Sequence, residues 1–129
     1  MNQAPDSFIQ ICGIAGIDKD MAQKKWLTVW EKSIQELLTS TINDPTTSAH
    51  ELELLQVVFL EVKNGNYKDE NVLDVLAKAL DDDSQKEMTD RFAKLFTKNI
   101  DDFYVNLESQ MTIEQKQVYN SFLEANNNV

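Results

Sequence analysis

The chain has 129 residues and a formal net charge of −10, with 42% hydrophobic and 26% charged residues. This length suffices for a compact domain with a buried core, and the apolar fraction is too high for a chain that stays disordered. The acidic balance repels phosphate backbones and anionic membrane surfaces, so we expect no direct binding of nucleic acid or membrane.

Four Ser/Thr-x-x-Glu/Gln patterns predict helix starts. In such a pattern the hydroxyl caps one free N–H group while the acid or amide bonds back to another. Asp18 and Asn66 can cap two further helices, and Gly16 and Gly65 can end two of them. The chain is therefore predicted to be all-α, with six helices. The four patterns are Ser7 with Gln10, Ser48 with Glu51, Ser84 with Glu87, and Thr112 with Gln115.

Two long stretches show the spacing of amphipathic helices. Apolar residues recur at steps of three and four from Leu27 to Thr41 and again from Met88 to Leu107. Polar residues fall between them, on what would be the outer face. These are the second and fifth of the predicted helices.

Residues 52–62 are harder to assign. Their β-branched and aromatic side chains are typical of a buried strand. The capping pattern that begins at Ser48 favours a helix instead, and no other segment offers itself as a partner strand. We predict a buried helix here.

The two halves of the chain match when residues 26–37 are set against residues 92–103. Since periodic sequences align easily, a chance match of two amphipathic helices is the alternative explanation. We predict a single domain, 1–129, formed as a six-helix bundle. It would contain two tandem three-helix units, 6–65 and 66–127, related by pseudo-twofold symmetry. The matched pairs include Trp26 with Phe92, Trp30 with Phe96, Ile34 with Ile100, Lys32 with Lys98, and Phe59 with Phe122.

Few side chains offer catalytic or metal-binding chemistry. His50 and Cys12 are the only histidine and cysteine, too few for a zinc site, and no nucleophile motif surrounds either. Cys12 lies in an apolar stretch and is predicted to be a core residue. The run from Asp81 to Ser84 begins like a calcium loop, but Phe92 occupies the position of the bidentate glutamate. We therefore expect no metal, no cofactor and no enzymatic activity.

Trp26 and Trp30 lie one turn apart on one face of the second predicted helix. Tryptophan is costly to leave in water, which favours a core position for both side chains. The alternative is an exposed stripe that anchors a partner helix.

Acidic residues are concentrated in the second half of the chain. If the fourth predicted helix lies beside the outer face of the fifth, these carboxylates form one negative surface suited to a basic partner. A merely solvated face is the alternative. The residues of this predicted surface are Asp69, Glu70, Asp74, Asp81, Asp82, Asp83, Asp101 and Asp102.

These features favour a non-enzymatic protein-interaction module, such as an adaptor, an immunity protein or a small regulator, that binds a basic protein. One alternative is a nucleic-acid mimic whose spaced carboxylates inhibit a DNA- or RNA-binding protein. Another is an enzyme that uses a carboxylate pair. Self-association stays open. A single cysteine, the absence of a secretory signal after Met1 and the short apolar runs predict a cytoplasmic protein.

Overall fold

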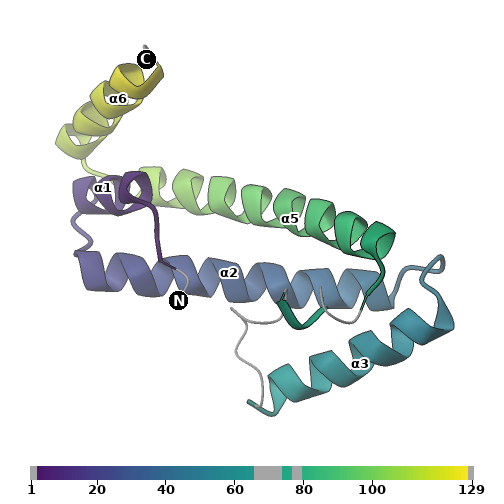
Figure 1. Ribbon diagram of the computed structural model, residues 1–129. Helices are drawn as coiled ribbons and strands as arrows, with labels where there is room; N and C mark the ends of the chain where they lie inside the picture. Colours follow the sequence, from purple (N-terminus) through teal and green to yellow (C-terminus); the bar gives the residue numbers. More distant parts are fainter. Residues whose placement is uncertain (1–2, 66–73, 77–79, 128–129) are drawn as a thin grey trace. The chain divides into compact units, whose positions relative to one another are not determined.

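The computed structural model describes residues 3–65, 74–76 and 80–127. In these ranges all the regular secondary structure is helical and no strand occurs, as the sequence predicts. Residues 74–76 form one helical piece. The other helices are α1 (Asp6–Ile14), α2 (Lys19–Ile42), α3 (Ala49–Lys63), α5 (Asp82–Ser109) and α6 (Ile113–Asn127) (Figure 1).

Three of the predicted caps are confirmed. The Asp18 carboxylate accepts a hydrogen bond from the N–H of Met21 at 2.8 Å, and the Ser48 hydroxyl accepts one from the N–H of Glu51 at 3.2 Å. Thr112 and Gln115 make both bonds of a capping box, at 3.1 and 2.9 Å. Each bond satisfies an N–H group that the first turn of a helix leaves free.

Two predicted caps are wrong. α1 begins at Asp6, directly after Pro5, so Ser7 lies inside its first turn, and no side chain caps this helix. α5 begins at Asp82, because the Asp81 carboxylate accepts from the N–H of Ser84 at 2.8 Å and takes the capping place. The predicted cap at Asn66 lies outside the described residues.

The helix ends and the uncertain third helix follow the prediction. Gly16 and Gly65 have φ values of +85° and +80°, the left-handed conformation that ends a helix cheaply at glycine. Residues 52–62 are helical, within α3. The capping bond at Ser48 starts a helix in a segment whose composition would also suit a strand.

The chain divides into two compact units. Unit 1 contains Thr28–Asn99, and unit 2 contains Asn2–Leu27 and Ile100–Val129. The boundaries fall inside α2 and inside α5, so each unit takes a part of both helices. The single domain and its repeats, 6–65 and 66–127, have different limits and stay predictions.

The core of unit 1 is mostly aliphatic. α2 contributes Ile34, Leu37 and Leu38, each with no exposed surface, and α3 contributes Leu55 and Val58. The ring of Trp30 packs against this cluster and lies 4.7 Å from that of Phe92 and 5.2 Å from that of Phe96, centroid to centroid.

The core of unit 2 is built around an aromatic group. The ring of Phe8, on α1, lies 5.1 Å from that of Trp26 and 5.3 Å from that of Phe103. Cys12 is fully buried beside them, as predicted, and burial raises the pKa of its thiol. Burial also raises the pKa of Tyr104 to about 12. Both tryptophans thus pack into a core, as predicted, but into different ones.

Candidate functional site

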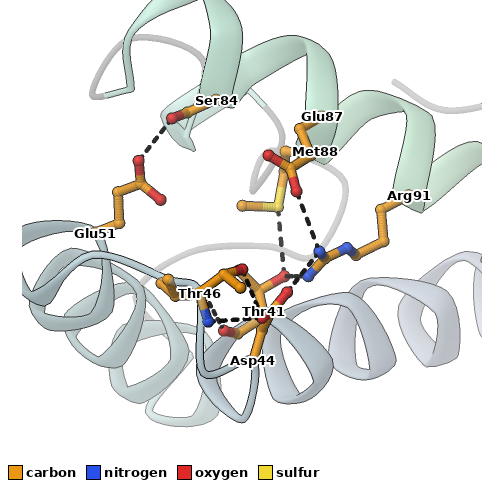
Figure 2. A pocket seen from close by; sticks show the side chains of 9 residues that line it. Thr41, Asp44, Thr46, Glu51, Ser84, Glu87, Met88 and Arg91 are labelled. Carbon is orange, nitrogen blue, oxygen red and sulfur yellow. Dashed lines mark hydrogen bonds and ion pairs between the residues drawn. The ribbon is translucent and has the colours of Figure 1, made fainter.

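A polar pocket lies in unit 1, where the end of α2 and the first turns of α3 and α5 meet (Figure 2). Its cavity volume of about 40 Å³ leaves room for a water molecule or one small group. Pockets that enclose a small-molecule ligand are several times larger. The lining residues are Thr41, Asp44, Thr46, Thr47, Glu51, Ser84, Glu87, Met88 and Arg91.

Arg91, the only arginine in the chain, is the centre of this pocket. Its Nη2 donates to Asp44 Oδ2 at 2.9 Å and to Glu87 Oε1 at 3.4 Å, and its Nη1 donates to Thr41 Oγ1 at 3.1 Å. The Arg91 and Asp44 side chains are 27% and 23% exposed, so water only partly screens this ion pair. The guanidinium joins α5 to the loop that follows α2.

The loop is also held by the Asp44 carboxylate itself. Its Oδ1 accepts hydrogen bonds from the backbone N–H and the hydroxyl of Thr46, at 2.9 and 2.7 Å. Those bonds, together with Arg91, lower the pKa of Asp44 to about 2. Asp44 therefore stays ionised near neutral pH, where a general acid or base has to exchange a proton.

The first turns of α3 and α5 are connected by a side-chain bond. The Ser84 hydroxyl donates to Glu51 Oε1 at 2.6 Å, and Figure 2 shows the two side chains pointing toward each other. Both residues lie three positions after their helix cap, Asp81 for α5 and Ser48 for α3. The two helix starts are therefore neighbours.

The bottom of the pocket is formed by Thr41 and Met88. Thr41 is buried, and its hydroxyl donates to the carbonyl of Leu37 at 2.8 Å and contacts the Met88 sulfur at 3.8 Å. The Thr47 hydroxyl donates to the carbonyl of Thr41 at 2.7 Å. The polar groups here bond to one another. These bonds hold the loop between α2 and α3 in one conformation.

The structure places most of the predicted acidic surface. Asp74, Asp81, Asp82 and Asp83 are exposed in unit 1, and Asp101 and Asp102 are exposed on α5 in unit 2. Asp69 and Glu70 lie outside the described residues. Capping uses the carboxylate of Asp81, and the bonds from Ser84 lower the pKa of Asp81. A single continuous acidic surface stays a prediction, since its residues belong to two units.

The predictions about His50 and metals concern other groups. His50 is exposed in the first turn of α3. In the described ranges, no three or more His, Cys, Asp or Glu side chains lie together as a metal site would require. No described helix has the length and apolar character needed to cross a membrane.

Two features of unit 1 were missed in the sequence. The first is the group around Arg91, whose only signal was a single arginine in a chain that otherwise uses lysine. The second is a pair of exposed apolar side chains on α3, Val57 and Leu60. A helix with apolar residues on all its sides gives a hint of such a pair, but the sequence does not say which side is left uncovered.

No protein-family model, curated protein or solved structure matches the chain.

Proposed function

We propose that this chain is a non-enzymatic interaction module that binds a basic surface of a partner protein. One observation carries the proposal: in unit 1 the only guanidinium is engaged by Asp44, whereas Asp82 and Asp83 are exposed at the start of α5. The bonds from Arg91 to Asp44 and from Ser84 to Glu51 hold the first turns of α5, which carries these two carboxylates.

Charge complementarity makes such a surface useful for recognition. A negative patch attracts a positive partner over a Debye length of roughly 8 Å at physiological salt, which raises the association rate. The net charge of −10 also disfavours partners that are themselves acidic. The expected interaction is therefore sensitive to salt.

The proposal includes the internal duplication. α2 and α5 contact each other in unit 1 through several pairs of residues, which include Trp30 with Phe92 and Thr41 with Arg91. In two further pairs the rings of Trp30 and Phe96 lie 5.2 Å apart, and Asn99 Nδ2 donates to Ser33 Oγ at 2.9 Å. These last two pairs join positions that correspond in the alignment of residues 26–37 with 92–103. A twofold axis that exchanges two helices passes between equivalent positions, so these contacts support a pseudo-twofold origin.

Affinity capture tests the binding function. We would use as baits the wild-type protein, Asp82→Asn/Asp83→Asn, and a control of equal charge change in unit 2, Glu114→Gln/Glu124→Gln. The lysate would come from the organism that encodes the chain, and bound proteins would be eluted with a salt gradient. We expect the wild-type protein and the control to retain a basic protein that moderate salt releases. Asp82→Asn/Asp83→Asn should not retain it.

The other possible outcomes of the affinity capture would contradict or replace this proposal. Equal loss from both variants would show that bulk charge alone retains the partner. Equal retention by all three baits would show that Asp82 and Asp83 do not contact it. If the retained proteins are DNA- or RNA-binding proteins released by added nucleic acid, the mimic alternative replaces the general one.

A further inference from the structure

α6 is held to unit 2 by one row of side chains. The structure describes this unit over residues 3–27 and 100–127. Every side chain described in α6 is exposed except those of Gln115, Tyr119 and Phe122. These residues follow one another at steps of four and three, so they form a single row along the helix. α6 therefore contacts the rest of the unit mainly along one narrow strip.

This strip rests on α1 and on the turn that follows it. α1 and α6 pack together, and Tyr119, which is 6% exposed, belongs to the same core cluster as Ile11 and Cys12 of α1. In the turn, a Cβ atom on Gly16 would lie 3.8 Å from Gln115 Nε2. The first turn of α6 is thus placed over the end of α1.

The cover that α1 gives to α6 is shallow. Val118 and Leu123 lie on either side of the buried row and are 55% and 37% exposed. The polar side chains of α6 bond locally, as Ser121 Oγ does when it donates to the carbonyl of Gln117 at 3.0 Å. The buried row, and above all the ring of Tyr119, is therefore what keeps α6 on α1.

The centre of the unit 2 core does not include α6. The ring of Phe8 lies 5.1 Å from that of Trp26, 5.3 Å from that of Phe103 and 6.0 Å from that of Tyr104. These rings belong to α1, α2 and α5. Removing α6 from α1 would leave this aromatic group in place.

We propose that α6 is a displaceable arm, which detaches from α1 as one unit while the aromatic group around Phe8 stays folded. Local stability follows the number of buried apolar contacts, so a helix held by one strip opens at a lower free energy than the core does. Detachment uncovers Tyr119 and the side of α1 against which it packs. The arm thereby controls access to an apolar surface of unit 2. This device does not depend on the binding proposed for unit 1.

Hydrogen exchange of the full-length wild-type protein measures the opening. The amides of residues 117–126 report on α6, and those of residues 103–107 report on α5 in the same unit. Exchange is followed by NMR at several urea concentrations below the unfolding transition. After correction for intrinsic rates, we expect the α6 amides to be protected at least about tenfold less than the α5 amides. They should also share one dependence on urea, weaker than that of α5, because detachment exposes less surface than unfolding does.

Two neighbouring substitutions separate the buried row from its exposed flank. Tyr119→Ala removes the buried ring, and Val118→Ala is the matched control on the same turn of α6. We expect Tyr119→Ala to lower the protection of the α6 amides by about a further tenfold or more and to leave residues 103–107 unchanged. Val118→Ala should change neither set. Circular dichroism shows whether each variant keeps its other helices.

Four results would overturn the proposal. Equal protection and equal urea dependence of the two sets would show that α6 opens only when the whole unit unfolds. Protection that declines step by step toward residue 126 would show fraying of a chain end, not detachment of one unit. Unprotected amides throughout wild-type α6 would show that the helix does not dock. A Tyr119→Ala effect of equal size on residues 103–107 would make Tyr119 part of the core.

Discussion

The two units bury different kinds of side chain, although α2 and α5 contribute to both. In unit 1 the middle of the core is aliphatic, with Leu37 and Leu55 fully buried. In unit 2 the middle is Phe8, whose ring contacts three other aromatic rings. One continuous helix thus supplies two kinds of packing along its length, and each kind implies a different response to mutation.

Polar connections also differ between the units. Unit 1 joins segments far apart in the chain through Arg91, which bonds to Asp44 and Thr41. In unit 2 the backbone N–H of Ala4 donates to the Gln23 amide oxygen at 2.7 Å, which fixes the chain before α1. Unit 1 therefore joins distant segments through a charged side chain, and unit 2 does so through a neutral amide.

The largest expected effect is that of Phe8→Ala. Removing a buried aromatic ring destabilises a protein by about 3–5 kcal/mol, and Phe8 is 1% exposed. Leu55→Ala in unit 1 is the matched change, with an expected cost of about 2–5 kcal/mol. Urea unfolding followed by circular dichroism compares them. A larger loss for Leu55→Ala would contradict the expectation that Phe8 contributes more to stability than Leu55 does.

The tryptophans allow the units to be followed separately. Trp26 packs in unit 2 and Trp30 in unit 1, so Trp30→Phe and Trp26→Phe each leave one fluorescent reporter. Added to these backgrounds, Phe8→Ala should lower the urea midpoint at Trp26 further than at Trp30. Coincident midpoints would show that α2 and α5 make the units unfold together.

Asn99→Ala comes next in expected size. Asn99 is 5% exposed, and its amide donates to Ser33 Oγ at 2.9 Å and to Glu36 Oε1 at 3.3 Å. Losing a buried hydrogen bond and leaving a partner unpaired costs about 1–3 kcal/mol. A double-mutant cycle with Ser33→Ala measures the pair directly. A coupling energy near zero would mean that Ser33, which also donates to Val29, does not depend on Asn99.

The helix caps provide a smaller comparison between the units. Thr112→Ala should destabilise α6 by about 1 kcal/mol, because Thr112 makes both bonds of a capping box with Gln115. Ser48→Ala removes the hydroxyl that accepts from Glu51 at the start of α3, and we expect a smaller loss. Urea midpoints rank the two, and the reverse order would show that the Glu51 bond to Ser84 depends on the Ser48 cap.

The titration of Asp44 has the smallest effect on stability near neutral pH, because the carboxyl is already ionised there. Its pKa of about 2 in the folded protein lies below the ordinary value of 3.8, so the ionised form stabilises the fold. That contribution is complete above about pH 4 and is lost as the pH falls toward about 2. Carboxyl-carbon NMR gives the pKa directly. Both Thr46→Val and Arg91→Met should raise it, and an unchanged value in either would remove that residue from the explanation.

Local chemistry was predictable from the sequence, and competition between neighbours was not. Asp18, Ser48 and Thr112 act on an N–H group within three residues, so their spacing alone predicted the caps. Ser84 had the same spacing but failed, because Asp81 stands three residues earlier and its carboxylate accepts from the Ser84 N–H. The pattern cannot choose between two competent caps.

Contacts between distant segments had no sequence signal of this kind. Arg91 lies 47 residues from Asp44 and 50 from Thr41, and periodicity contains no information about such pairs. The same holds for Val57 and Leu60. Periodicity predicted that α3 is apolar, but which side faces the core depends on the other elements of unit 1.

Cys12 is a natural probe of local opening in unit 2. It is the only thiol in the chain and has no exposed surface, so a thiol reagent can reach it only when the surrounding packing opens. Its labelling rate, divided by that of the unfolded chain, reports how often the aromatic cluster around Phe8 opens, with no foreign label or engineered residue. Followed over temperature or in the presence of a partner, one natural atom records the motion of unit 2.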